Sequence, residues 1–213
     1  MSSQLEYAYR FIKQGILDGT YKPSQKLVET QLSDLIGVSR NTVKTALLKL
    51  EQENLVKIES NKGATIKSFS LEEVENYLEI REVLEGLIIR SAAPNFTEED
   101  LQNMEQIMLQ MGNYLHENKY DDYSKKNNEF HNMIYKLAKN SQAVKMVNVI
   151  KTQLIRYHFR TILIPGRSEK SLQEHQAIYH ALKTRDISSA EEKMKRHVAN
   201  VRNTIKENFQ LLL

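Results

Sequence analysis

The sequence predicts a mainly α-helical protein: an N-terminal winged helix-turn-helix with a small β-hairpin, followed by an all-α antiparallel helical bundle. Apolar residues recur at helical spacing along most of the 213 residues, and paired β-rich runs occur only between about residues 55 and 67. Seven glycines and three prolines interrupt the chain, which favours long helices. We therefore expect a first domain at residues 1–68 and a second at residues 71–213.

Three short helices are predicted in the first domain. The first, over residues 5–16, precedes a break at Tyr21–Ser24. The second ends at Gly37, since glycine favours helix C-termini, and the third follows Ser39, a good N-cap, and continues to about Glu53. The apolar positions of the second helix are Leu27, Leu32, Leu35 and Ile36. Two helices separated by so short a turn predict a helix-turn-helix.

A β-hairpin is predicted after the third helix. Leu55–Glu59 and Ala64–Lys67 are short and rich in β-formers, and Ser60–Gly63 between them has the composition of a turn. A hairpin in this place forms the wing, and Lys62 at its tip could reach a phosphate or the minor groove.

Polar and basic side chains occupy the face of the third helix opposite its apolar stripe. They cluster in the first turns, the end that enters the major groove in helix-turn-helix proteins. Arginine and lysine can bind guanine, asparagine can bind adenine, and hydroxyl groups can bind phosphate. The sequence therefore predicts a surface for double-stranded DNA. Its candidate residues are Ser39, Arg40, Asn41, Thr42, Lys44, Thr45, Lys62 and Gly63.

The charge distribution agrees with a polyanion-binding first domain. Residues 1–67 contain ten Lys/Arg and seven Asp/Glu, whereas the rest of the chain contains twenty of each. The chain has no cysteine, which excludes disulfides and thiolate metal sites and fits a reducing cytoplasm. It also lacks a long apolar run and a signal-peptide pattern, so we expect a cytoplasmic protein without a membrane partner.

The first domain resembles the GntR family of bacterial regulators. The resembling segments are Ile16–Pro23, Leu27–Glu29, Leu32–Arg40, Ala46–Leu50 and Asn61–Ala64. The resemblance implies a transcription regulator that binds operator DNA. The chain departs from the family pattern at Ser24, where glycine is usual, and within Ser39–Ala46. Because the latter changes fall on the groove-facing side, we expect a different operator sequence.

The second domain is predicted to be entirely helical. Its six helices are expected at about residues 71–92, 97–117, 119–138, 141–163, 169–184 and 187–210. Breaks are expected at Pro94-Asn95, Asn118, Asn140, Pro165-Gly166 and near Asp186. Short connections between such helices predict an antiparallel bundle.

Three histidines are predicted to face the interior of this bundle. His131, His175 and His197 each share a helical stripe with apolar residues. His175 and His197 lie equally far from the turn near Asp186, so an antiparallel hairpin places them opposite one another. Asn127 precedes His131 by one helical turn on the same face. Three imidazoles and an amide oxygen are a donor set for a divalent metal ion, and hydrogen-bonded core histidines are the alternative.

The second domain resembles the FCD ligand-sensing domain of FadR-type regulators in its six-helix form. The resemblance rests on Asn127–His131, Glu174–Ile178 and Met194–His197. It implies a divalent metal ion, zinc or nickel, bound by Asn127, His131, His175 and His197. The family usually has aspartate where this chain has Asn127. An amide is a weaker ligand than a carboxylate, but it leaves a more positive centre for an anion.

The resemblance further implies a small carboxylate effector, which Arg81, Arg156 and Arg160 could bind. An Arg81–Glu85 helix pair, and solvated positions for Arg156 and Arg160, are the alternatives. Such an effector would favour one arrangement of the DNA-binding domains, and the chain would act as a repressor. A homodimer on an inverted repeat is expected, because helix-turn-helix operators are usually two-fold.

Two other functions remain open from the sequence. A three-histidine centre is also typical of catalytic zinc, so a metal-dependent hydrolase is one alternative. Against it, no clear general base faces inward, since Glu129 points away from His131. The other alternative is an effector-free DNA-binding protein whose histidines are structural.

Overall fold

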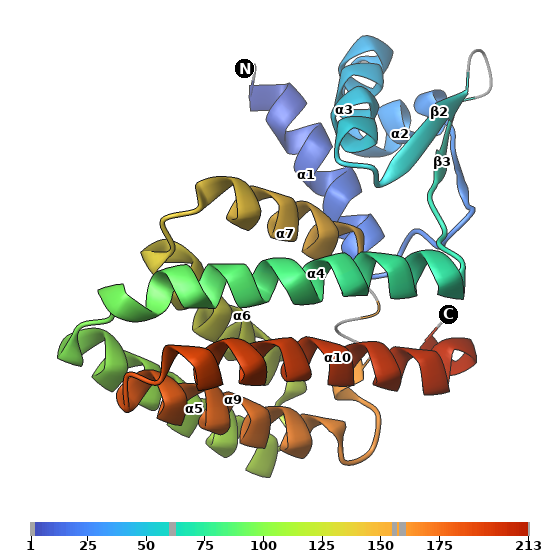
Figure 1. Cartoon of the computed structure of the whole chain (residues 1–213). Helices are drawn as coiled ribbons and strands as arrows, with labels where there is room; N and C mark the ends of the chain where they lie inside the picture. The colour runs from blue at the N-terminus through green and yellow to red at the C-terminus, as the bar shows by residue number, and fades with distance from the viewer. Residues whose placement is uncertain (1–2, 60–62, 155–156, 158–160, 213) are drawn as a thin grey trace. The chain divides into compact units, whose positions relative to one another are not determined.

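The computed structural model describes residues 3–59, 63–154, 157 and 161–212. The chain divides into two compact units, Met1–Ser70 and Leu71–Leu213 (Figure 1). The first is a winged helix-turn-helix and the second is an antiparallel helical bundle, so the predicted fold class is confirmed.

Helix α3 is the centre of the first unit. The helices of this unit are α1 (Ser3–Leu17), α2 (Glu29–Ile36) and α3 (Arg40–Gln52). The strands are β1 (Lys26–Leu27), β2 (Val56–Glu59) and β3 (Gly63–Ile66). Helices α1 and α2 and strand β2 all pack against α3. The apolar stripes therefore meet in one core, whose members include Ala8, Ile12, Leu32, Val43, Leu47, Leu50, Val56 and Ile66.

The wing belongs to a three-stranded antiparallel sheet with the order β1-β3-β2. Strands β2 and β3 form the predicted hairpin, with Val56 opposite Ile66. The prediction that Leu27 belongs to the second helix is wrong: Leu27 is buried in β1, opposite Ala64. Two residues are too few to show the period of a strand. Leu35 does lie on α2, but it is 65% exposed and is no part of the core.

The turn between α2 and α3 explains the local sequence. Gly37 adopts a left-handed conformation with φ 74°, and its N–H donates to the carbonyl of Ser33 at 2.9 Å. Ser39 is the N-cap of α3, and its Oγ accepts from the N–H of Thr42 at 3.1 Å. These two ends fix where α3 begins, and so they fix which side chains occupy its first turn.

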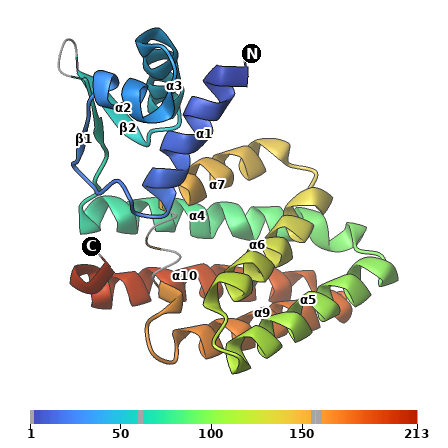
Figure 2. The ribbon, with the colours of Figure 1, turned by 180° about the vertical axis from the view of Figure 1, so that it is seen from behind.

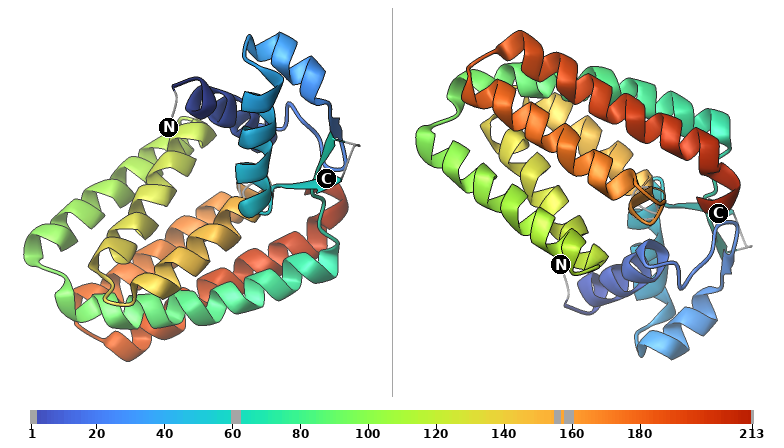
Figure 3. Two further views of the ribbon diagram at one scale, coloured as in Figure 1. Left: turned by 90° about the horizontal axis from the view of Figure 1, so that it is seen from above. Right: turned by 90° about the horizontal axis from the view of Figure 1, so that it is seen from below.

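The second unit is a bundle in which α4 and α10 run side by side (Figures 1 and 2). Its elements are α4 (Leu71–Ala92), the 3₁₀ turn η1 (Ala93–Asn95), α5 (Glu98–His116), α6 (Tyr120–Leu137), α7 (Ser141–Gln153), α9 (Arg167–Lys183) and α10 (Ile187–Leu212). Helix α10 packs on α4 and α9, whereas α5 packs on α6 and α9 (Figure 3). Helices α6, α9 and α10 therefore all contribute to one interior.

The predicted helix over residues 141–163 is not continuous. Helix α7 ends at Gln153, and Leu154 is its C-cap with φ −97° and ψ 8°. The apolar spacing continues past this point, which is why the sequence alone did not reveal the end. The other predicted bundle helices begin and end within a few residues of the observed ones. Among the described residues, none of the helices is long and apolar enough to cross a membrane.

Candidate functional site

Three imidazole rings meet inside the bundle. His131 comes from α6, His175 from α9 and His197 from α10, and their exposed fractions are 3%, 0% and 3%. Nε2 of His131 lies 3.3 Å from Nε2 of His175. The ring centroids of His175 and His197 are 4.6 Å apart, and those of His131 and His197 are 5.4 Å apart. The rings therefore surround one point.

The helix pattern explains this convergence. Each histidine continues a buried apolar stripe, which on α10 includes Ala190, Met194 and Val201. The turn around Asp186 joins α9 to α10 and brings His175 opposite His197. The predictions that the three histidines face the interior, and that these two lie opposite one another, are confirmed.

The surroundings of the three histidines favour their neutral form. Burial lowers the pKa of His131 and of His175 well below the ordinary value, and nearby positive charge lowers both further. Burial also lowers the pKa of His197, although the Glu174 carboxylate partly opposes this shift. Neutral imidazole has a free nitrogen lone pair, so each ring can act as a metal ligand without losing a proton first.

Glu174 fixes the orientation of the His197 ring. Its Oε2 lies 2.6 Å from Nδ1 of His197, and its Oε1 accepts from Asn200 at 2.8 Å. Burial raises the pKa of Glu174, but the bonds from His197 and Asn200 and the charge of Arg167 outweigh burial, and the pKa lies below its ordinary value. The carboxylate is therefore ionised and accepts the Nδ1 proton, which leaves the lone pair of His197 on Nε2. Sequence reasoning gave Glu174 no role.

The residues fit a divalent metal ion. One ligand nitrogen from each histidine lies within 4.8 Å of the other two. Two nitrogens bound to one tetrahedral zinc at its usual bond length are about 3.3 Å apart, which matches the separation between His131 and His175. Asn127 could add a further donor, because its Oδ1 is buried and has no hydrogen-bond partner among the described residues. A buried oxygen without a hydrogen-bond partner needs an explanation, and a role as a fourth metal ligand, one helical turn from His131, would provide one.

Arg81 forms the pair with Glu85 that the sequence offered as an alternative to effector binding. Both side chains are buried, and Nε of Arg81 lies 3.0 Å from Oε1 of Glu85. Tyr135 donates to the same oxygen at 2.5 Å. Nζ of Lys151 lies 5.0 Å from the centre of the Tyr135 ring. Sequence reasoning missed Lys151, while Arg156 and Arg160 lie outside the described residues.

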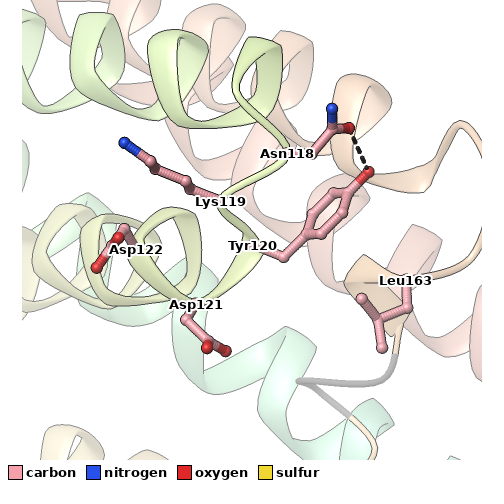
Figure 4. Close-up of a pocket in the computed structure, with 6 residues that line it drawn as sticks. All are labelled: Asn118, Lys119, Tyr120, Asp121, Asp122 and Leu163. Atoms are coloured by element: carbon pink, nitrogen blue, oxygen red, sulfur yellow. Dashed lines mark hydrogen bonds between the residues drawn. The ribbon is translucent and has the colours of Figure 1, made fainter.

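A surface hollow of about 340 Å³ is separate from the histidine cluster (Figure 4). Its lining residues are Asn118, Lys119, Tyr120, Asp121, Asp122 and Leu163. Asp122 precedes His131 by more than two turns on α6, or roughly 13 Å along the helix axis. The hollow therefore contributes nothing to the candidate metal centre.

Four predicted DNA-binding side chains are exposed at the beginning of α3: Ser39, Arg40, Asn41 and Lys44. Thr42 and Thr45 are half-buried, and their hydroxyls are already engaged. Oγ1 of Thr42 lies 2.8 Å from Oγ of Ser39, and Oγ1 of Thr45 donates to the carbonyl of Asn41 at 2.9 Å. The first two turns of α3 thus present one arginine, one lysine and one amide to solvent.

The two predicted wing positions are Lys62 and Gly63. Lys62 lies outside the described residues. Gly63 begins β3 with φ 85°, and a Cβ at this position would lie 2.8 Å from the carbonyl oxygen of Leu27. Glycine is therefore required here by the backbone, because a side chain would collide with β1.

Comparison with known proteins identifies both units. Residues 5–66 match the bacterial regulatory proteins of the gntR family, and residues 76–200 match the FCD domain. The chain belongs to the GntR family. The expected FadR-type organisation, with an FCD domain behind the winged helix-turn-helix, is confirmed.

Relatives of this GntR-family chain are similar along nearly its whole length. HTH-type transcriptional repressor RspR of Escherichia coli K12 is 25% identical over 199 residues, which cover 93% of this chain and 87% of that protein. The Uxu operon regulator of Haemophilus influenzae is 29% identical over 214 residues, covering 91% and 78%. The solved structure of E. coli McbR/YncC has a TM-score of 0.76 at 18% identity and covers 100% of this chain and 98% of that one. At this identity the structural likeness shows the fold alone.

Membership of the GntR family decides between a transcription regulator and a metal-dependent hydrolase. The chain is a transcription regulator that binds operator DNA, and its relatives are regulators rather than enzymes. The hydrolase alternative is therefore wrong.

Proposed function

We propose that this GntR-family regulator is a repressor whose affinity for operator DNA is set by a small carboxylate bound at a divalent metal ion. The observation that carries the proposal is the convergence of three buried, neutral imidazoles, with ligand nitrogens within 4.8 Å of one another. Zinc or nickel is the metal that such nitrogen donors favour.

The residues of the chain have distinct tasks at this centre. His131, His175 and His197 would hold the ion through nitrogen, and Asn127 would add its amide oxygen. Glu174 holds the ring of His197 in place. When bound, the ion supplies a positive centre with coordination positions open to carboxylate oxygens. Because Asn127 is neutral, the protein ligands add no negative charge, and anion binding is favoured.

Repression and dimerisation complete the proposal. The relative RspR is named a transcriptional repressor, which supports the same direction of control for this chain. A homodimer would present two α3 helices to an inverted repeat. Apolar side chains on α4 and α7 are half or more exposed and support an interface between copies: Ile80, Val83, Met146 and Val149. Bound carboxylate would favour one arrangement of the two DNA-binding units over the other.

Metal analysis and operator binding test the proposal together. We expect the purified protein to contain about one zinc or nickel ion per chain, and the variant His131→Ala to contain none. A panel of small carboxylates should include one that raises the melting temperature of the metal-loaded protein and changes its affinity for native promoter DNA. His116→Ala is the matched control, because His116 ends α5 outside the cluster.

The effector-free alternative predicts a different result. A protein with purely structural histidines would be purified without metal, and neither metal nor carboxylate would raise its melting temperature. Operator affinity would then be the same with and without every acid in the panel, and the proposal would fail.

A further inference from the structure

Arg167 is a buried arginine with unused hydrogen-bond donors. It is the first residue of α9, and only 6% of its surface is exposed. Its Nη2 donates to Oε2 of Glu174 at 3.0 Å. Neither Nε nor Nη1 has a hydrogen-bond partner among the described residues, although both atoms are buried.

The single partner of Arg167 does not satisfy the guanidinium. Oε2 of Glu174 also accepts the Nδ1 proton of His197, and Oε1 accepts from Asn200. One carboxylate therefore serves three donors. Buried charged donors without partners are strongly unfavourable, so such groups are expected to meet an anion when the protein is functional.

The guanidinium is adjacent to the histidine cluster. Arg167 and His197 bind the same oxygen of Glu174, so only one atom separates their hydrogen bonds. An anion bound by Nε or Nη1 of Arg167 would therefore lie within the reach of a small molecule that also contacts the three imidazoles.

The charged side chains around the histidine cluster favour an effector that carries more than one negative charge. Arg81, Lys151 and Arg167 carry positive charge beside the histidines, whereas Glu85 and Glu174 carry negative charge. Positive charge is in excess by one before a divalent ion is added and by three afterwards. A dicarboxylate neutralises this excess better than a monocarboxylate does.

We propose that Arg167 binds one carboxylate of a dicarboxylate effector whose other carboxylate lies at the histidine centre. This inference rests on the proposed function, and it adds the class of effector and the residue that selects it. A guanidinium suits this task because its donors lie in one plane and remain charged at every physiological pH.

Calorimetric titration of the zinc-loaded full chain tests the inference. The probes are acetate as the monocarboxylate and malonate, succinate and glutarate as dicarboxylates. At least one dicarboxylate should bind the natural protein tenfold or more tightly than acetate does. In Arg167→Lys this preference should disappear while the affinities for acetate and for zinc stay within about threefold. The conservative variant keeps a positive charge beside Glu174, and Arg196→Lys, an exposed position on α10, is the matched control.

A second measurement does not depend on the metal. In protein stripped with a chelating resin, the best dicarboxylate should still raise the melting temperature of the natural chain, and it should raise that of Arg167→Lys less.

The outcomes separate this inference from the proposed function. If Arg167→Lys keeps the natural preference for the dicarboxylate, Arg167 does not bind the effector, although the carboxylate sensor stands. If zinc, acetate and dicarboxylate all weaken equally, Arg167 only positions Glu174, and the inference is wrong. If no carboxylate binds the natural zinc-loaded protein, both proposals fail.

Discussion

Oε2 of Glu174 lies 2.6 Å from Nδ1 of His197, and this contact directs Nε2 of His197 toward His131 and His175. A carboxylate in this place fixes both the tautomer and the angle of the ring. Glu174→Gln keeps the shape of the side chain but replaces the ionised acceptor. We expect zinc affinity to fall by about 10–100-fold, measured by competition with a chromophoric chelator. Glu192→Gln, on the exposed face of α10, should leave zinc affinity unchanged.

Lys151 gives a stability effect with a defined pH range. Burial and, to a smaller extent, the positive charge of Arg81 lower the pKa of Lys151 to about 8, and the charge of Glu85 opposes this shift only in part. In the unfolded chain the pKa of lysine is about 10.4, so between these values the unfolded state binds more protons. The contribution of Lys151 to stability therefore rises as pH increases from about 8 to 10.

Removing this amine should stabilise the protein at neutral pH. We expect Lys151→Met to raise the free energy of unfolding at pH 7 by about 1–2 kcal/mol, after allowance for the remaining exposure of the side chain. The gain should shrink as pH approaches 10. Urea unfolding of metal-free protein measures it, with the exposed Lys145→Met as control. A gain that is equal at pH 7 and pH 10 would contradict the assigned cause.

Arg40 is the exposed arginine in the first turn of α3. We expect Arg40→Ala to weaken binding to the native operator by about 1–3 kcal/mol and to reduce discrimination against altered operators. Fluorescence anisotropy at fixed salt measures both quantities. Arg10→Ala removes the same charge from an exposed position on α1 and should reduce specificity much less. An equal loss on all sequences would mean that Arg40 contacts a phosphate rather than a base.

Gly63 lies where β3 approaches the carbonyl of Leu27. Gly63→Ala would introduce both a contact at 2.8 Å and a side chain at positive φ, so we expect the first unit to lose about 1–3 kcal/mol of stability. Gly112→Ala is the informative control. A Cβ at this position of α5 meets only Leu172 at 3.7 Å, and alanine should stabilise the helix by up to about 1 kcal/mol. Chemical denaturation measures the change in the free energy of unfolding for each variant, which should be negative for Gly63→Ala and positive for Gly112→Ala.

The sequence predicted those features that depend on local periodicity. The apolar stripes on α6, α9 and α10 placed His131, His175 and His197 in the interior, and the position of the turn near Asp186 aligned two of them. Strand β1 was missed because two residues carry no period. Leu35 was counted among the apolar positions of its helix, but it lies on the exposed side of α2, away from the buried Leu32 and Ile36.

The sequence alone did not reveal the roles of Arg167 and Glu174, and each omission has a physical reason. Helix α9 was expected to begin at residue 169, so Arg167 counted as part of the break at Pro165-Gly166. In fact Gly166, with φ 75°, allows the helix to begin at Arg167. Glu174 precedes His175 and therefore points to a different side of α9. Its contact with His197 arises from packing between α9 and α10, which spacing along one helix does not reveal.

The depth of the three imidazoles has a consequence for timing. All three rings are almost completely enclosed within the described chain, and they come from three helices that must separate before a ligand nitrogen reaches water. An ion held there would exchange slowly, because the ligand nitrogens are shielded from water in the folded bundle. The acid would then exchange faster than the ion, so changes in the concentration of the acid, rather than of the metal, would set the affinity for DNA.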